Sequence, residues 1–425
     1  MKGDGVRVQL AIALPLAERI ADIISKMKGV TDVSIAGSLR RKRETVKDID
    51  IVVATDTPEA VVEEFLKLPI VSQVIAQGLT KVSVTLNMGL QMDLRLVKPQ
   101  EFHSALQHFT GSKEHNAKLR SIALKMGYKL NEYGLFEKDG EGVFLPKSEE
   151  ELYSKLGMPY IIPELREDRG EIEAALQDSL PELVKLEDIR GDLHVHSTFS
   201  DGISSIEEIV NKAIELGYEY IAITDHSKSL KIARGLDEGR LREQLEHIKN
   251  LNQKVKGIRI LTGMEVDILP DGSLDMNDDI LKELDVVIAS IHSGFKQDQK
   301  TLTSRIVNAC HNPYVKIIAH PTGRLIGRRA AYDVDMDKVM EAAAETGTVL
   351  EINSSPDRLD LNDVHVKRAA EMGIKIAIDT DAHSTEALSD MRYGVWVARR
   401  GWLAAENIIN TFSLDKLLKF LKVMK

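Results

Sequence analysis

The sequence lacks several features that would place it in whole classes of protein. It has a single cysteine, Cys310, which excludes an internal disulfide. It has no apolar run of the roughly eighteen residues that a transmembrane helix needs. Its start, MKGDGVRVQL, lacks the charged, apolar and small-residue layout of a signal peptide. Together these absences favour the cytoplasm.

The chain also lacks an excess of basic residues: 56 Lys and Arg stand against 66 Asp and Glu, a net charge of −10. A nucleic-acid partner would therefore need a local basic patch, because acidic metal ligands count as negative although a bound metal neutralises them. Residues 40–47, RRKRETVK, form such a patch, with five basic residues and one acidic residue. Most patches of this kind are solvated surface, so the flanking residues must decide.

The first part of the chain has the pattern of a mixed α+β unit. An apolar face predicts a helix over 15–28, ended by Gly29, and Pro58 opens a second helix that extends to 68. Strands are expected at 33–36, 48–54, 71–76, 81–87 and 91–97, which form a small, mostly antiparallel sheet. We assign residues 1–154 to this domain and residues 155–190, with their prolines and acidic residues, to a linker.

Residues 191–425 change character and repeat a short apolar strand followed by a helical stretch, which predicts an α/β barrel. The sequence favours seven strands, one fewer than the usual barrel. They are expected near 192–196, 220–225, 258–267, 286–291, 315–319, 348–353 and 375–380.

The most informative N-terminal segment is GSLRRKRETVKDIDIVV. Asp48 and Asp50 are two residues apart on a predicted strand, so their side chains share one face. Asp93 lies on a later strand that could pair beside the first. Close carboxylates repel each other unless a cation lies between them, which indicates a site for Mg²⁺ or Mn²⁺. Three carboxylates can hold two metals, one activating a 3′-hydroxyl and one holding a triphosphate.

Residues upstream of these aspartates strengthen this interpretation. Gly37 and Ser38 offer close backbone approach and a hydroxyl to phosphate oxygens, and Arg40 and Arg41 would neutralise charge as pyrophosphate leaves. Alone, the DxD pattern is most often two solvent-facing aspartates. The combination of the DxD pattern with these upstream residues favours a catalytic site.

This pattern resembles the palm of family X DNA polymerases, the nucleotidyltransferases that fill repair gaps. The resemblance continues in HFTGSKEHNAKLR, where the family carries a turn that contacts the incoming nucleotide. It implies that His108 and Phe109 lie against the sugar, with Gly111 in the turn, and that Asn116 and Arg120 reach the nucleotide and the template minor-groove side. His108 stands where a tyrosine is expected, which affects sugar selection.

Members of that family usually begin with helix-hairpin-helix modules that hold DNA. No hairpin of the type GxGxK precedes residue 15, so we expect the chain to start close to the palm, without those modules.

Potential metal ligands follow almost every strand of the predicted barrel. Because the carboxyl ends of parallel barrel strands meet at one mouth, these side chains should converge. Mixed imidazole and carboxylate ligands suit Zn²⁺, Mn²⁺ or Fe²⁺, and nine ligands are enough for two or three ions. Six of the twelve histidines of the chain are among them. The candidates are His194, His196, Asp201, His226, Glu265, His292, His320, Asp381 and His383.

Residues 190–400 resemble the PHP domain, the polymerase and histidinol phosphatase family, whose fold is a distorted seven-stranded barrel. The resemblance implies three ion sites. The first would use His194, His196, Glu265 and Asp381, the second Glu265, His292 and His320, and the third Asp201, His226 and His383. Arg234, Arg324 and Arg358 lie in loops after strands, where they would meet a substrate phosphate.

The order of palm and PHP domain resembles the bacterial and archaeal family X polymerase/3′–5′ exonucleases. It implies a DNA repair enzyme that uses dNTPs and primer–template, gapped or 3′-end DNA, with a manganese-dependent nuclease that trims 3′ ends and processes abasic sites. Two alternatives stay open: a PHP small-molecule phosphatase of the histidinol-phosphate type with an inactive N-terminal domain, and a DNA-binding scaffold without a working palm. The sequence leaves the oligomeric state open.

Overall fold

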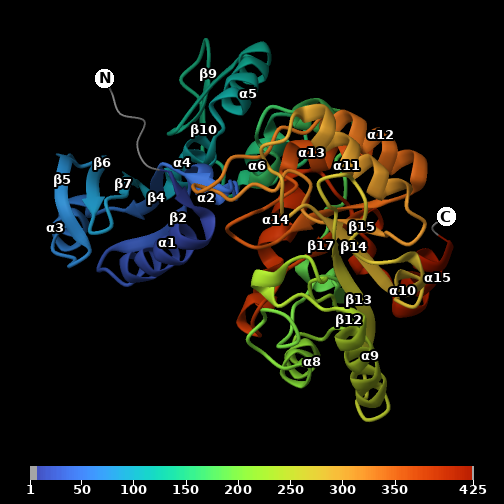
Figure 1. Cartoon of the computed structure of the whole chain (residues 1–425). Helices are drawn as coiled ribbons and strands as arrows, with labels where there is room; N and C mark the ends of the chain where they lie inside the picture. The colour runs from blue at the N-terminus through green and yellow to red at the C-terminus, as the bar shows by residue number, and fades with distance from the viewer. Residues whose placement is uncertain (1–6, 424–425) are drawn as a thin grey trace. The chain divides into compact units, whose positions relative to one another are not determined.

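The computed structural model describes residues 7–423, and the chain forms two compact units that meet between Leu180 and Pro181 (Figure 1). Among the described residues, no helix has both the length and the apolar character needed to cross a membrane. The predicted linker 155–190 departs from this division, because its residues up to Leu180 belong to the first unit. Within this segment Arg166 is fully buried and pairs with Glu149, and residues 171–176 form a helix.

The first unit is built on a five-stranded sheet in the order β2-β4-β7-β6-β5. The central strands β4 and β7 run parallel and the other pairs run antiparallel, which agrees with the expected small, mostly antiparallel sheet. The strands are β2 (Val30–Ile35), β4 (Asp48–Thr55), β5 (Val71–Gln77), β6 (Lys81–Leu86) and β7 (Gln91–Val97). A short pair, β1 (Val8–Gln9) and β3 (Thr45–Val46), lies outside this sheet.

Four helices accompany this sheet: α1 (Leu10–Ser25), α2 (Gly37–Arg40), α3 (Pro58–Leu66) and α4 (Phe102–Thr110). Helix α1 begins five residues before the predicted start, with Pro15 inside it. A proline in the second turn removes one helical hydrogen bond and crowds the carbonyl of residue i−4. Buried Leu10, Ala13 and Leu14 extend the apolar face backwards, so packing outweighs that loss.

The rest of the first unit is a smaller α+β part. It contains α5 (Lys113–Lys125), a three-stranded antiparallel sheet of β8 (Tyr128–Asn131), β9 (Gly134–Glu137) and β10 (Val143–Phe144), and the helices α6 (Glu149–Lys155) and α7 (Glu171–Leu176). Ser112 caps α5 by accepting a hydrogen bond from the His115 amide, and Ser148 caps α6 in the same way.

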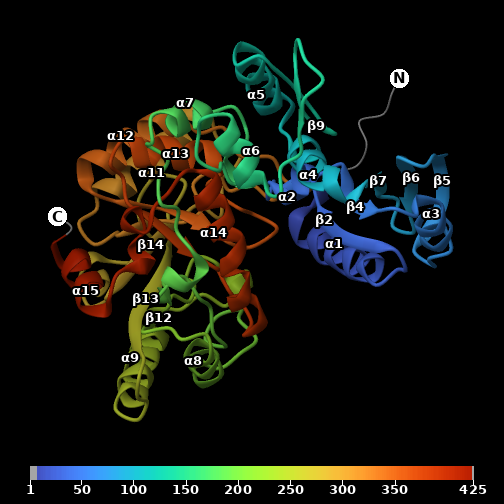
Figure 2. The same ribbon diagram turned by 180° about the vertical axis from the view of Figure 1, so that it is seen from behind.

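The second unit is the predicted parallel barrel, with seven strands that neighbour one another in chain order. They are β11 (Gly191–Asp192), β12 (Tyr220–Ile223), β13 (Arg259–Asp267), β14 (Val286–Ser290), β15 (Ile317–Ile318), β16 (Val349–Asn353) and β17 (Ile376–Asp379). The helices are α8 (Ile206–Glu215), α9 (Glu238–Asn252), α10 (Asp278–Leu281), α11 (Gln299–His311), α12 (Met336–Thr346), α13 (Asp363–Glu371), α14 (Met391–Arg400) and α15 (Leu414–Val423). Helices α11, α12 and α13 lie together along one side of the barrel in both views (Figures 1 and 2).

A polar seam joins the first and last strands of the barrel. The Asn410 side chain donates to the carbonyls of Gly191 and Ile378 and accepts from the Ile378 amide. Thr380 Oγ1 donates to Asp192 across the same gap. These bonds replace a continuous ladder between β11 and β17, so the carboxyl ends of all seven strands are held around one mouth.

Candidate active sites

The carboxylates of the first unit meet on the parallel strands β4 and β7. The register places Asp50 opposite Asp93 and Asp48 opposite Gln91, so the three aspartates that the sequence singled out lie together. Burial, together with the neighbouring carboxylates of Asp48 and Asp93, raises the pKa of Asp50 to about 7. This repulsion is what a divalent cation would relieve, and an all-carboxylate set suits a hard cation.

Asp93 already has a cationic partner. Lys81 Nζ lies 2.7 Å from Asp93 Oδ2, while Ser83 Oγ donates to Oδ1 at 2.6 Å. Burial would raise the pKa of Asp93, but Lys81, Ser83 and Gln91 outweigh it and hold the pKa below its usual value. Sequence reasoning missed Lys81, although its position two residues before Ser83 on β6 puts both on the face of Asp93.

Gly37 lies directly against this carboxylate group. It has a φ of +62°, and a Cβ added there would come within 2.2 Å of Asp50 Oδ2. Only glycine fits such a position. The close approach of the α2 backbone to Asp50 that the sequence suggested is therefore present, with Ser38 half-buried beside it.

The basic patch is largely neutralised inside the protein. Arg40 Nη2 pairs with Glu149 at 2.5 Å, and Glu167 pairs with Arg41 at 3.0 Å and with Arg43 at 3.1 Å. Sequence reasoning missed both glutamates, and Glu167 lies in the segment predicted to be a linker. These arginines thus hold residues 149–167 against the sheet, which a phosphate-binding role alone did not predict.

The turn after α4 brings the residues of HFTGS together. Gly111 has a φ of +72° and follows Phe109, whose ring lies 4.5 Å from the Arg95 guanidinium. His108 packs edge-to-face on Phe109 at 5.0 Å. Burial lowers the pKa of His108, and Glu132 opposes this shift.

Asn116 is engaged within the protein in this structure. Its Oδ1 accepts from Gln107 Nε2 at 2.8 Å, and its Nδ2 donates to the His108 carbonyl at 2.7 Å. These bonds leave one lone pair of Oδ1 and one hydrogen of Nδ2 for a nucleotide contact. Arg120 is exposed on α5.

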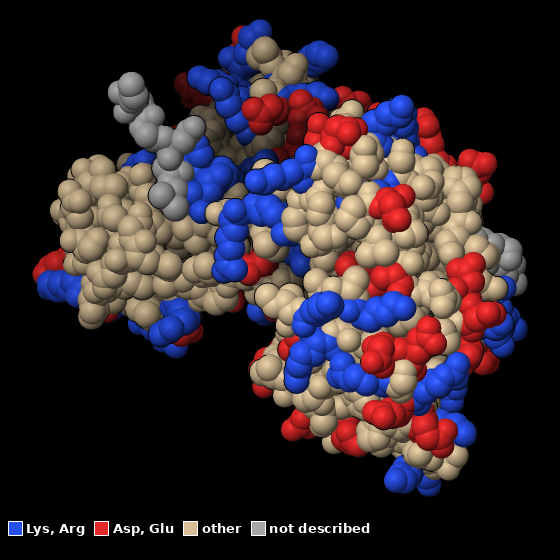
Figure 3. Space-filling view, in the orientation of Figure 1, with Lys and Arg blue, Asp and Glu red and all other residues tan. Residues whose placement is uncertain are grey.

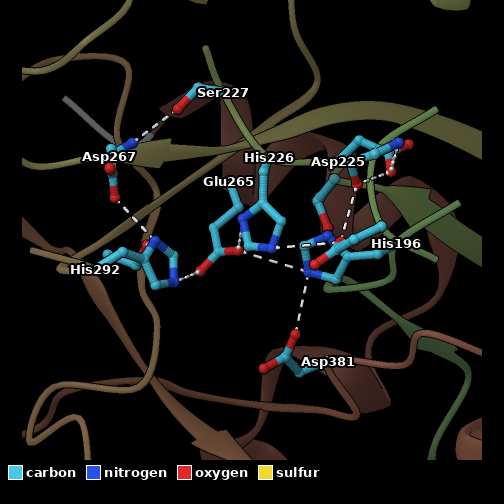
Figure 4. Close-up of polar contacts among 12 residues, drawn as sticks. His196, Asp225, His226, Ser227, Glu265, Asp267, His292 and Asp381 are labelled. Atoms are coloured by element: carbon cyan, nitrogen blue, oxygen red, sulfur yellow. Dashed lines mark hydrogen bonds and ion pairs between the residues drawn. The ribbon is translucent and has the colours of Figure 1, made fainter. Parts of the chain in front are cut away.

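In the second unit, all nine predicted ligands converge at the carboxyl ends of the strands. Glu265 on β13 lies at the centre, with Oε2 2.8 Å from His226 Nδ1 (Figure 4). Its Oε1 lies 3.0 Å from His320 Nε2. His292 Nε2 lies 3.4 Å from the same Oε1. Both oxygens of one carboxylate thus face imidazoles on opposite sides, which is the geometry of a bridging ligand.

Asp381 forms a second centre with the histidines that follow β11. Its Oδ1 lies 3.0 Å from His196 Nε2 and 3.6 Å from His194 Nε2. Both Nε2 atoms are buried and lack a hydrogen-bond partner among the described residues. Buried, unsatisfied imidazole nitrogens aimed at a carboxylate are what a metal ion would satisfy, so these residues fit the expected cations.

Asp201 completes the cluster at its outer side. Its Oδ1 lies 3.3 Å from His383 Nε2 and 3.6 Å from His226 Nε2. Three groups have ligand atoms within 4.8 Å of one another: His196, Asp201, His226 and His383; His194, His196 and Asp381; and His226, Glu265 and His292. His226 therefore faces two groups with its two nitrogens, whereas the resemblance placed it in one.

Two buried carboxylates orient the ligands from behind. Glu351 Oε1 lies 2.6 Å from His194 Nδ1, and Asp267 Oδ1 lies 2.8 Å from His292 Nδ1. Such contacts fix the ring orientation and leave Nε2 toward the metal. Sequence reasoning missed both, although Asp267 lies two residues after Glu265 and thus on the same face of β13.

Of the three arginines proposed for phosphate binding, Arg358 forms an ion pair with a predicted metal ligand, Asp381. Its Nε lies 3.4 Å from Asp381 Oδ2. Arg324 supports it by donating from Nε to the Arg358 carbonyl at 2.9 Å. Arg234 is exposed on the loop after β12.

Known protein families match parts of both units. The DNA polymerase beta thumb family matches residues 105–167, and the PHP domain family matches residues 192–355. The DNA polymerase/3′-5′ exonuclease PolX of Bacillus subtilis (strain 168) is 48% identical over 418 residues, which cover 98% of this chain and 73% of that protein. A probable phosphatase of Thermoanaerobacter sp. (strain X514) is 34% identical over 246 residues, 55% of this chain and 95% of that protein.

Among solved structures, the polymerase beta of Leishmania infantum in a ternary P/T complex is 23% identical, with a TM-score of 0.34, and the match covers 38% of this chain and 77% of that one. The long match to the Bacillus relative, which spans both acidic centres, decides the assignment. The chain belongs to the family X DNA polymerases that carry a C-terminal PHP domain, the PolX family of polymerase/3′-5′ exonucleases.

Proposed function

We propose that the chain adds nucleotides to a DNA 3′ end at the Asp48, Asp50 and Asp93 centre and removes nucleotides from 3′ ends at the Glu265 centre. The observation that carries this proposal is the presence of two separate clusters of different chemistry on converging strands. We assign nucleotidyl transfer to a palm and thumb in residues 1–154 and hydrolysis to residues 191–425. The proposed partners are dNTPs and primer–template, gapped or 3′-end DNA, and the proposed location is the cytoplasm.

At the palm, Asp48, Asp50 and Asp93 would hold Mg²⁺ or Mn²⁺. When bound, the cations lower the pKa of the primer hydroxyl and hold the triphosphate. Gly37 lets the α2 backbone approach the phosphates, with the Ser38 hydroxyl and Arg41 beside it. Phe109 and His108 would lie against the sugar, next to the turn at Gly111. Asn116 and Arg120 would follow on α5.

At the barrel, the nine ligands would hold two or three Mn²⁺, Zn²⁺ or Fe²⁺ ions. When bound, such ions lower the pKa of a coordinated water and neutralise the scissile phosphate. Glu351 and Asp267 hold the His194 and His292 rings in place. Arg358 would orient a phosphate beside Asp381.

The small-molecule phosphatase is the second candidate, and the probable phosphatase of Thermoanaerobacter, which matches the barrel unit, favours it. That candidate needs no palm. The retained register of Asp50 opposite Asp93, with Gly37 against them, argues for a working palm, as does the Bacillus relative.

Primer extension and 3′ hydrolysis of the same labelled DNA test the proposal. Asp48→Ala with Asp50→Ala should abolish extension with Mg²⁺ or Mn²⁺ and leave hydrolysis intact. Asp32→Ala with Asp56→Ala, two exposed aspartates of the same sheet region, is the matched control and should retain both. Wild-type protein that hydrolyses small esters but neither extends nor trims DNA would establish the phosphatase instead. Binding of DNA without either reaction would indicate a scaffold.

A further inference from the structure

The loop that follows β12 combines unpaired positive charge with exposed apolar surface. We call residues 227–235, SKSLKIARG, the basic loop. It contains Lys228, Lys231 and Arg234 and no acidic residue, in a chain with a net charge of −10. All three side chains are exposed. Within the described part of the chain, none of the three forms an ion pair, whereas Arg328 on another mouth loop pairs with Asp357 at 3.4 Å.

Both ends of the basic loop lie at the metal-site residue His226, which directly precedes the loop. The amide of Leu236, just after the loop, donates to the carbonyl of His226 at 2.7 Å. Ile232 is four residues from Leu236, so it lies at most about 14 Å from this anchor. Stacked nucleotides rise 3.4 Å per step along one strand. The loop therefore lies within about four nucleotide steps of a strand end held at the metal site.

The base of the loop is hydrogen-bonded to two buried carboxylates. Ser229 Oγ donates to Asp267 Oδ2 at 2.6 Å, and the Ser229 amide donates to Asp275 at 2.8 Å. These two carboxylates are buried and face the loop base, not its cations. Asp267 also holds the ligand His292, so the loop and the metal centre share one support. In the space-filling view, Lys and Arg side chains gather over the yellow-green segment that follows β12 (Figure 3).

Two isoleucines, one in the basic loop and one on a loop bonded to the ligand His383, are unusually exposed. Ile232 is 93% exposed at the tip of the basic loop, in the 3-10 helix η4 (Lys231–Ala233). Ile203 is 77% exposed, and its amide donates to the carbonyl of the ligand His383 at 2.8 Å. His226 and His383 both face Asp201, so the two isoleucines stand on neighbouring loops around the same group.

We propose that the basic loop and Ile203 form a binding site for the last nucleotides of a single-stranded 3′ end. Lys228, Lys231 and Arg234 would bind the phosphates upstream of the scissile bond, and Ile203 and Ile232 would contact the bases. Phosphates spaced along a strand match several unpaired cations, and unpaired bases offer apolar faces. This inference rests on the proposed nuclease function and extends it from the scissile phosphate to the strand behind it.

The test compares kcat/KM for a single-stranded oligonucleotide at increasing salt, with Mn²⁺ and without dNTPs, in the full chain. Lys228→Ala/Lys231→Ala/Arg234→Ala should flatten the slope of log(kcat/KM) against log salt by about 2, because each phosphate contact on a single strand adds about 0.7. Ile232→Ser should raise KM roughly fivefold without changing the slope. Lys231→Arg should retain the wild-type slope.

The matched control is Lys254→Ala/Lys256→Ala/Arg259→Ala, which removes the same charge from exposed residues at the opposite, amino-terminal end of β13. It should keep the wild-type slope, and circular dichroism melts check that all variants fold. Equal slopes in the basic-loop variant and this control, with a wild type that digests the oligonucleotide, would overturn the inference. A wild type that hydrolyses neither oligonucleotide nor bis(p-nitrophenyl) phosphate would instead refute the nuclease function itself.

Discussion

In the first unit three carboxylates lie together and the cations Lys81 and Arg95 pair with one of them, Asp93, whereas in the second unit six histidines surround three carboxylates. The consequence is visible in the pKa values. Burial and its two neighbours raise the pKa of Asp50 to about 7. Burial also acts on Glu265, but His226, His292 and His194 outweigh it and hold its pKa well below the usual value. The imidazoles of the barrel offset its carboxylates, whereas at the palm the pKa values of Asp48 and Asp50 stay raised.

This difference predicts different responses to the loss of one ligand. Glu265→Gln keeps the shape of the side chain but removes the charge that faces His226 and His320. Since loss of an outer-shell partner already costs about 10–100-fold, we expect loss of a carboxylate that would hold two ions to reduce 3′ hydrolysis by more than about 100-fold. Extension should be unchanged. Hydrolysis near the wild-type rate, measured with excess Mn²⁺, would show that Glu265 is not a bridging ligand.

The positions of the barrel ligands were predictable because their rule is topological. The carboxyl ends of parallel strands meet at one mouth, so His194 at the first strand and Asp381 after the last could be paired without coordinates. The palm aspartates followed from the same-face spacing of Asp48 and Asp50. Only the pairing of β4 with β7 had to be assumed for Asp93.

The remaining residues depend on tertiary packing. Glu149 and Glu167 meet the basic patch from more than a hundred residues away, and nothing local in the sequence marks them as partners of Arg40 and Arg41. Glu351 is a similar case, because it lies in β16, whose sequence predicts a buried strand and nothing more. Asp267 was within reach, because it shares a strand face with Glu265.

The supporting ion cluster of the first unit gives that unit its own pH dependence. Glu149 is buried, and Arg166 and Arg40 outweigh the effect of burial, lowering its pKa from 4.5 to about 2. A lowered folded-state pKa contributes stability above pH 4.5, which is lost as the pH falls toward 2. The difference corresponds to about 3 kcal/mol.

Thermal or urea unfolding of the first unit between pH 5 and pH 2.5 checks this. Glu149→Gln should be less stable than wild type at pH 5 and show a flatter decline, because its amide does not titrate. An equally steep loss in the variant would mean that other carboxylates dominate acid unfolding.

Loss of Asp267, which supports the His292 ring, should reduce hydrolysis less than loss of a metal ligand. Asp267→Asn keeps a hydrogen-bond acceptor for His292 Nδ1 but removes the charge behind it. We expect a loss of about 10–100-fold in Mn²⁺ affinity or hydrolysis. Titration of activity with Mn²⁺ measures this, with Asp271→Asn, an exposed aspartate on the next turn, as the control. Full activity at low Mn²⁺ would place His292 outside the metal set.

The smallest predicted effect concerns the lysine that stands at the palm. Lys81 Nζ, 2.7 Å from Asp93, occupies a place beside the carboxylates where it competes with a metal cation. Its side chain is 37% exposed, and ion pairs of that kind contribute about 0.2–1 kcal/mol. Lys81→Met keeps the length of the side chain and removes its charge, so Mn²⁺ should bind the palm up to about fivefold more tightly when no nucleotide is present.

Calorimetry measures this affinity in a Glu265→Gln background, which weakens the barrel site so that the heat comes mainly from the palm. Lys98→Met, an exposed lysine just after β7, should leave the affinity unchanged. Weaker Mn²⁺ binding in Lys81→Met would mean that the lysine organises Asp93 for the metal instead of competing with it, and the palm would then share the preorganisation of the barrel.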